Sequence, residues 1–195
     1  MKKALVVASS LALVLAWAGI GEAQGKKGRP KAASGAPEAI VFDAASAMAF
    51  LTTTSGDWAP AGAAEHAEGA RRTASVVTVK TKAAGSAVVH HYAQGTPGEM
   101  ETVFHMDGDK LLLTHYCALQ NAPILRFEKT NKPGEIKFVF EGGTNFDSSV
   151  DAHLHESTFQ VIDKNTVEQR STVFTNGKAQ PELKSVLHRK ASVTQ

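Results

Sequence analysis

Alternating apolar and polar residues dominate the chain beyond about Arg72, and turn-forming residues interrupt them at short intervals. Such alternation is typical of strands with one buried face. Asp43 is a suitable N-cap for a short helix ending near Leu51, and Gly56-Asp57-Trp58 opens the first extended element. The runs predicted to be strands are 73–82, 86–94, 99–106, 110–117, 124–130, 135–141, 152–162, 166–174 and 182–190.

Short turns join these runs, with no helical pattern between them, which predicts an antiparallel meander. A flat sheet of this many strands would leave two unprotected edges, and closure into a barrel removes them. We therefore predict an all-β fold: an antiparallel up-and-down barrel of about 8–10 strands, preceded by a short N-terminal helix. A two-sheet sandwich is the alternative, disfavoured because the connections resemble tight sequential hairpins.

The segment 99–117 predicts a β-hairpin and assigns its two faces. Gly108-Asp109 suits a type II′ turn, which sets Asp107 opposite Lys110. Counting outward from the turn gives one largely apolar face on which His115 and Cys117 also lie. The pairs expected on this face are Met106 with Leu111, Phe104 with Leu113, Thr102 with His115, and Met100 with Cys117.

Several polar side chains fall on strand faces that the pattern predicts to be buried. His153 and His155 share one face of a strand, and inward-facing Phe159 and Val161 would place both inside, although Leu154 favours the opposite face. His90 and His91 must face opposite ways, and the pattern does not choose between them. The candidate residues for an interior ligand site are Phe104, Leu113, His115, Cys117, His153 and His155.

Three interpretations of these residues remain open. In the first, the barrel binds a small, mainly apolar molecule, with the histidines as polar anchors. In the second, His115, His153 and His155 converge on a divalent metal, as three imidazoles do in some β-scaffolds, and the protein is a metal-binding barrel or a metal-dependent enzyme. In the third, the barrel is filled and has a structural or interaction role. Cys117 and His115 are two positions apart on one strand, so their side chains point in parallel rather than toward each other, which disfavours a Cys/His catalytic pair. We assign no catalytic residue and no cofactor.

The N-terminus predicts export. Lys2 and Lys3 precede an apolar run from Ala4 to Ile20, and small residues at Gly21 and Ala23 suit a signal peptidase, so residues 1–23 are a predicted signal peptide. Residues 24–39 form a predicted flexible basic linker, residues 40–190 the barrel, and residues 191–195 a tail. We expect a periplasmic or secreted protein with no stable membrane insertion after cleavage.

The net charge of +2 arises from the N-terminal segments. Without residues 1–37, 15 basic and 18 acidic residues remain, so a basic nucleic-acid-binding face is not expected. Cys117 is the only cysteine, which excludes an intramolecular disulfide.

Several motifs together resemble a group of uncharacterised bacterial exported proteins with a lipocalin-like, calycin-type β-barrel. The resemblance covers roughly residues 42–190 and implies a closed barrel with an internal cavity, but no established activity. The motifs that carry it are Gly56-Asp57-Trp58, the segment 104–109, Thr114-His115-Tyr116-Cys117, His153-Leu154-His155, the segment 175–178, and His188-Arg189.

Overall fold

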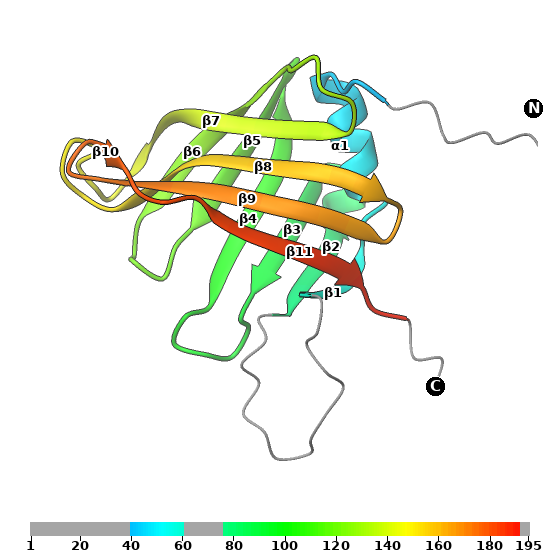
Figure 1. Cartoon of the computed structure of the whole chain (residues 1–195), viewed down its shortest axis with the longest axis horizontal. Coiled ribbons are helices and arrows are strands. Elements are labelled where there is room, and N and C mark those ends of the chain that lie inside the picture. The colour runs from blue at the N-terminus through cyan, green and yellow to red at the C-terminus, as the bar shows by residue number, and fades with distance from the viewer. Residues whose placement is uncertain (1–39, 61–75, 192–195) are drawn as a thin grey trace, which may run out of the picture. The chain divides into compact units, whose positions relative to one another are not determined.

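The computed structural model describes residues 40–60 and 76–191, and these residues form an almost entirely β structure (Figure 1). The predicted signal peptide, the linker up to residue 39 and residues 192–195 of the tail lie outside the described residues. The first part of the predicted strand 73–82 lies outside them as well. Within the described ranges, no helix has the length and apolar character needed to cross a membrane.

The described elements match the predicted order closely. Helix α1 spans Ala44–Thr52, and a short 3-10 turn, η1, spans Ala83–Gly85. Strand β6 begins at Ala122, before the predicted start at Ile124, so Pro123 belongs to the strand. The strands are β1 (Gly56–Pro60), β2 (Val77–Lys82), β3 (Ala87–Tyr92), β4 (Met100–Asp107), β5 (Lys110–Tyr116), β6 (Ala122–Glu128), β7 (Glu135–Thr144), β8 (His153–Asp163), β9 (Thr166–Thr175), β10 (Lys178–Ala179) and β11 (Leu183–Arg189).

The strands close into the predicted antiparallel barrel of ten strands. Each strand from β1 to β9 pairs with the next, β9 pairs with β11, and β11 returns to β1. The two-residue strand β10 also pairs with β9, beyond the end of β11. Closure leaves no long unpaired edge in this ring, which is the physical reason that the meander could be predicted to close. The architecture is consistent with a lipocalin-like barrel.

The β4–β5 hairpin has the predicted register. Thr102 pairs with His115, Phe104 with Leu113 and Asp107 with Lys110. Gly108 has φ +60°, the left-handed value that the first central position of a type II′ turn requires. The pairing ends at Tyr116, so the predicted Met100–Cys117 pair does not form, and Cys117 lies in the turn that follows.

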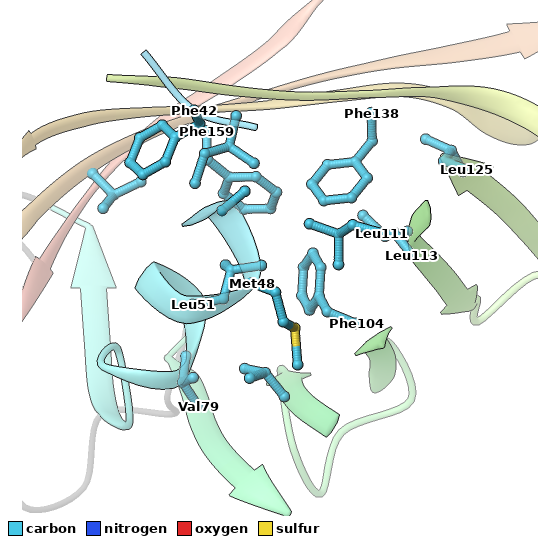
Figure 2. Close-up of a cluster of buried hydrophobic side chains, with 14 of the residues drawn as sticks. Phe42, Met48, Leu51, Val79, Phe104, Leu111, Leu113, Leu125, Phe138 and Phe159 are labelled. Carbon is cyan, nitrogen blue, oxygen red and sulfur yellow. The ribbon is translucent and has the colours of Figure 1, made fainter. Parts of the chain in front are cut away.

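Helix α1 covers one end of the barrel (Figure 1). Asp43 caps it as predicted, its carboxylate accepting a hydrogen bond of 2.8 Å from the Ser46 backbone N–H. Its buried face consists of Ala47, Met48 and Leu51. Figure 2 shows Met48 and Leu51 pointing from the helix toward the side chains of the core. The helix therefore closes this end with apolar packing.

Three phenylalanines form an aromatic layer across the barrel next to α1. The ring centroid of Phe104 on β4 lies 5.5 Å from that of Phe138 on β7 and 5.8 Å from that of Phe159 on β8. Strand β4 neighbours neither β7 nor β8 in the sheet, so these rings meet across the interior (Figure 2). Much of the interior volume is therefore filled by side chains.

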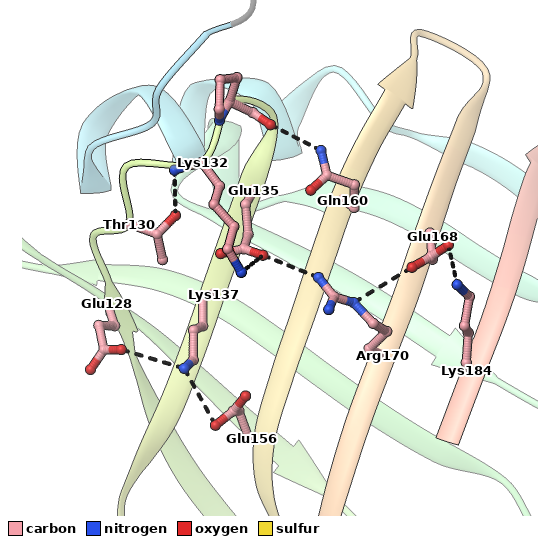
Figure 3. Close-up of polar contacts among 11 residues, drawn as sticks. Glu128, Thr130, Lys132, Glu135, Lys137, Glu156, Gln160, Glu168, Arg170 and Lys184 are labelled. Carbon is pink, nitrogen blue, oxygen red and sulfur yellow. Dashed lines mark hydrogen bonds and ion pairs between the residues drawn. The ribbon is translucent and has the colours of Figure 1, made fainter. Parts of the chain in front are cut away.

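A row of charged side chains ties β7, β9 and β11 together on the outer face (Figure 3). The carboxylate of Glu135 contacts Arg170 Nη2 at 3.1 Å and Lys132 Nζ at 3.4 Å. Glu168 in turn contacts Arg170 Nε at 3.5 Å and Lys184 Nζ at 2.7 Å. Glu135 lies on β7 and Arg170 on β9, the strands on either side of β8. This ion pair therefore links two strands that are not neighbours in the sheet.

Candidate binding site in the barrel interior

Contacts between strands that are not neighbours identify the side chains that face the interior. Gln169 on β9 donates a hydrogen bond of 3.3 Å to the hydroxyl of Tyr92 on β3. The rings of His90 on β3 and Phe159 on β8 lie 5.9 Å apart. Because neither β8 nor β9 adjoins β3 in the sheet, all four side chains point into the barrel.

His90 rather than His91 is the interior histidine of this pair. The ring of His90 packs 4.7 Å from Phe104 and is buried. His91 points outward, where its Nδ1 lies 3.1 Å from a carboxylate oxygen of Glu101. The sequence left this choice open because both histidines have an apolar neighbour on their own face.

Five polar residues form a layer beside the aromatic layer, and we call them the polar layer: His90, Tyr92, Thr102, His115 and Gln169. The Tyr92 hydroxyl lies 3.3 Å from His90 Nδ1 and accepts the hydrogen bond from Gln169. Thr102 Oγ1 and His115 Nδ1 are 2.8 Å apart. These bonds satisfy most of the buried polar atoms and fix the orientation of the two imidazoles.

Burial keeps the polar layer uncharged. Desolvation lowers the pKa of His90 to about 3, with a smaller contribution from the neighbouring His91. The same effect lowers the pKa of His115 to about 4. Burial raises the pKa of Tyr92 to about 12, against the opposing effect of its hydrogen bond with Gln169. At neutral pH the layer therefore offers neutral donors and acceptors.

The polar layer lies toward the end of the barrel opposite α1. Inward-facing Gln169 and Ser185 pair with each other across β9 and β11 and are only half-buried. Leu183, two residues before Ser185 and therefore on the same face, is 64% exposed. The interior thus changes from closed apolar packing at α1 to solvent-accessible side chains at the far end, which we call the open end.

A small cavity lies on the other side of His90, toward α1. Its volume is about 30 Å³, close to the space of one water molecule, and its walls are almost entirely apolar. His90 contributes to its wall, and His90 Nε2 is buried without a hydrogen-bond partner among the described residues. Phe50 and Leu51 line it from the helix, and Thr54 lines it from the segment that follows the helix.

Three of the six predicted site residues lie together in the interior. Phe104 and Leu113 are fully buried in the core, and His115 is buried beside Thr102. Cys117 was expected on the same buried face, but it is partly exposed in the turn after β5. That expectation failed because the strand ends at Tyr116, one residue before the cysteine.

His153 and His155 do not face the interior as expected. Strict alternation would place Leu154 and Phe159 on opposite faces of β8. A β-bulge between Leu154 and Glu156 interrupts this alternation, so both side chains pack against the core. His153 pairs with Phe174 on the opposite face from Leu154. The bulge therefore resolves the conflicting sequence signals, since both apolar residues point inward and the histidines do not.

The two histidines instead form a hydrogen-bonded pair among aromatic rings. His153 Nδ1 donates to the backbone carbonyl of Asp151 at 2.9 Å, which leaves Nε2 to accept from His155 Nδ1 at 3.1 Å. The ring of His155 stacks between Phe174 at 3.7 Å and Phe140 at 4.8 Å. Burial and the adjacent His153 lower the pKa of His155, opposed by Glu156.

The structure does not bring the three proposed metal ligands together. His115 belongs to the interior polar layer, whereas His153 and His155 lie on the other face of the sheet. Across residues 40–60 and 76–191, no three His, Cys, Asp or Glu side chains are grouped as a metal ion would require.

Sequence reasoning missed Tyr92, Gln169 and Thr102 as members of the site. Thr102 was predicted opposite His115, so its place on the inner face was available, but its hydrogen bond was not. Tyr92 and Gln169 are 77 positions apart and meet only because the sheet closes. No local signal could have paired them.

No protein-family model matches the chain, and no curated protein matches it.

Proposed function

We propose that the mature chain is an exported β-barrel that binds one small, mainly apolar molecule at the open end of its interior. The observation that carries this proposal is the neutral polar layer beside apolar packing. A ligand would place a hydrogen-bonding group on His115 or Gln169 and its apolar part against neighbouring inward side chains. Binding sites of this kind combine an apolar lining with a few fixed polar groups.

His115 is the best candidate for direct contact with the ligand. Its Nδ1 is held by Thr102, and its Nε2 has no hydrogen-bond partner among the described residues. Since burial keeps the imidazole neutral above about pH 4, it supports recognition of an uncharged polar group such as a hydroxyl or carbonyl.

We expect untagged protein, purified from a host that exports it, to release a small molecule on denaturation, identified by mass spectrometry. Retention should fall about tenfold in His115→Leu, because an unsatisfied hydrogen bond costs about 1–3 kcal/mol. His105→Leu is the matched control, since His105 lies on β4 with its side chain on the outer face. An empty wild-type barrel that also binds nothing from a panel of apolar compounds would contradict the proposal.

A filled barrel with a structural or interaction role is the second candidate. The aromatic layer and the small size of the cavity near α1 favour it. It predicts neither a released molecule nor any effect of His115→Leu beyond stability, so the same experiment separates the two functions.

Export is tested independently. We expect the mature protein to begin at Gln24, because Gly21 and Ala23 occupy the two positions that signal peptidase reads. Intact-mass measurement of protein from the periplasm or medium would show the loss of residues 1–23. Ala23→Arg should block cleavage, whereas Lys31→Ala in the linker should leave the mature N-terminus unchanged. Recovery of the full-length chain from the wild type would contradict the assignment.

A further inference from the structure

Among the described residues, the hydrogen bonds around the cavity near α1 leave His90 Nε2 without a partner. Thr54 Oγ1 donates to the Leu51 carbonyl at 2.6 Å, and Trp58 Nε1 donates to the Thr54 carbonyl at 2.9 Å. Within residues 40–60 and 76–191, His90 Nε2 has no such partner, and it is buried. A buried polar group without a hydrogen-bond partner is unfavourable, so a partner supplied from outside the protein would stabilise it.

The hydrogen bonds on the other side of the ring are compatible with a His90 tautomer in which Nδ1 accepts. The Tyr92 hydroxyl accepts from Gln169, and its own hydrogen is then available to His90 Nδ1, 3.3 Å away. With Nδ1 as an acceptor, the hydrogen of the neutral imidazole resides on Nε2. In this tautomer, His90 presents a hydrogen-bond donor on the side away from Tyr92.

The cavity suits an acceptor group better than a water molecule. A buried water is usually held by about three hydrogen bonds, but the unpaired donor here is a single N–H among apolar walls. A charged group would be strongly disfavoured by the same walls. One neutral acceptor on an apolar molecule matches both features.

Phe50 offers a route into the cavity. It lines the cavity from α1, is only partly buried, and packs against Phe42 with ring centroids 5.6 Å apart. Movement of this side chain would enlarge the space without displacing the fully packed Ala47 and Leu51 of the same helix.

We propose that the cavity between α1 and the barrel wall is a second binding site, which takes a small neutral ketone or similar carbonyl compound. The carbonyl oxygen accepts a hydrogen bond from His90 Nε2, and the carbon chain replaces part of the volume of Phe50. This site lies on the opposite side of His90 from Tyr92 and the open end, and it does not depend on the proposed function.

The test uses butan-2-one and its isostere 2-methylbut-1-ene, in which a methylene group replaces the carbonyl oxygen. Both are titrated into ¹⁵N-histidine-labelled protein, and NMR follows the His90 Nε2 and Nε2–H signals. We expect the ketone to bind about tenfold more tightly than the alkene, which corresponds to one recovered hydrogen bond. Phe50→Ala should tighten both by enlarging the site, and Phe42→Ala is the control beside it.

His90→Leu should abolish the preference for the ketone, while the outward-facing His91→Leu should keep it. If His90→Leu does not fold, the wild-type ¹⁵N measurement alone decides. Equal affinity for ketone and alkene, or absence of binding even in Phe50→Ala, would overturn the proposal. So would ketone-induced shifts confined to His115, which would place the ketone at the open end and support the proposed function instead.

Discussion

Below pH 6.5, we expect the free energy of unfolding of the barrel to fall by several kcal/mol, because burial makes the pKa values of His90 and His115 lower in the folded state than in the unfolded chain. Both histidines take up a proton near pH 6.5 in the unfolded chain, but only near pH 3 and pH 4, respectively, in the folded barrel. Between these values the unfolded state binds more protons, so acid favours unfolding. Each histidine contributes up to about 1.4 kcal/mol per pH unit.

Above about pH 7, both states are neutral at these two positions, and the histidines contribute no pH dependence. Urea unfolding at a series of pH values from 7.5 to 4 would measure the effect. The informative quantity is the slope against pH, because His90→Phe also changes core packing. We expect a shallower slope in His90→Phe and an unchanged slope in the exposed control His188→Gln. Identical slopes in His90→Phe and the wild type would show that His90 is not the group involved.

Replacing Arg170 by leucine is expected to cost about 3 kcal/mol or more, because it leaves a buried carboxylate with one exposed partner. The Glu135 side chain is only 3% exposed, whereas that of its remaining partner Lys132 is 71% exposed (Figure 3). Arg170 also contacts Glu168, so the substitution breaks the row between β7 and β11.

Chemical denaturation of three variants would isolate the buried charge. Lys184→Met removes an exposed end of the row and should cost less than about 1 kcal/mol. The double variant Glu135→Leu/Arg170→Leu should recover much of the loss, because no uncompensated charge remains buried. A loss below about 1 kcal/mol in Arg170→Leu would mean that water reaches Glu135 freely.

The hairpin 99–117 shows how far local pattern could be trusted. Its turn, its register and the inward position of His115 all follow from Gly108 and strict alternation, and the structure confirms them. Strand β8 shows the limit of the same rule. The alternation there predicted inward histidines only when Leu154 was left out of account. A bulge that the sequence of the strand does not indicate reversed the assignment.

The candidate site was predictable only in part for a similar reason. His115, Phe104 and Leu113 lie on one local hairpin, so their common face follows from the sequence. Tyr92 and Gln169 belong to strands that are distant in the sequence and are not neighbours in the sheet. Their hydrogen bond depends on which residues lie opposite each other across the closed barrel. The periodicity of apolar residues along each strand does not indicate which residues these are.

The sequence by itself determined the fold class, the capped helix and the strand order, because each rests on interactions between residues close in the chain. Tertiary structure decided which of His90 and His91 faces inward, and it separated His115 from His153 and His155. It also placed His90 Nε2 beside a small cavity with no hydrogen-bond partner in the described part of the chain. These outcomes depend on bulges, strand ends and contacts across the barrel. The physical reason is that strand alternation assigns faces only while the register is unbroken, whereas burial and hydrogen-bond partners are set by the closed assembly of all the strands.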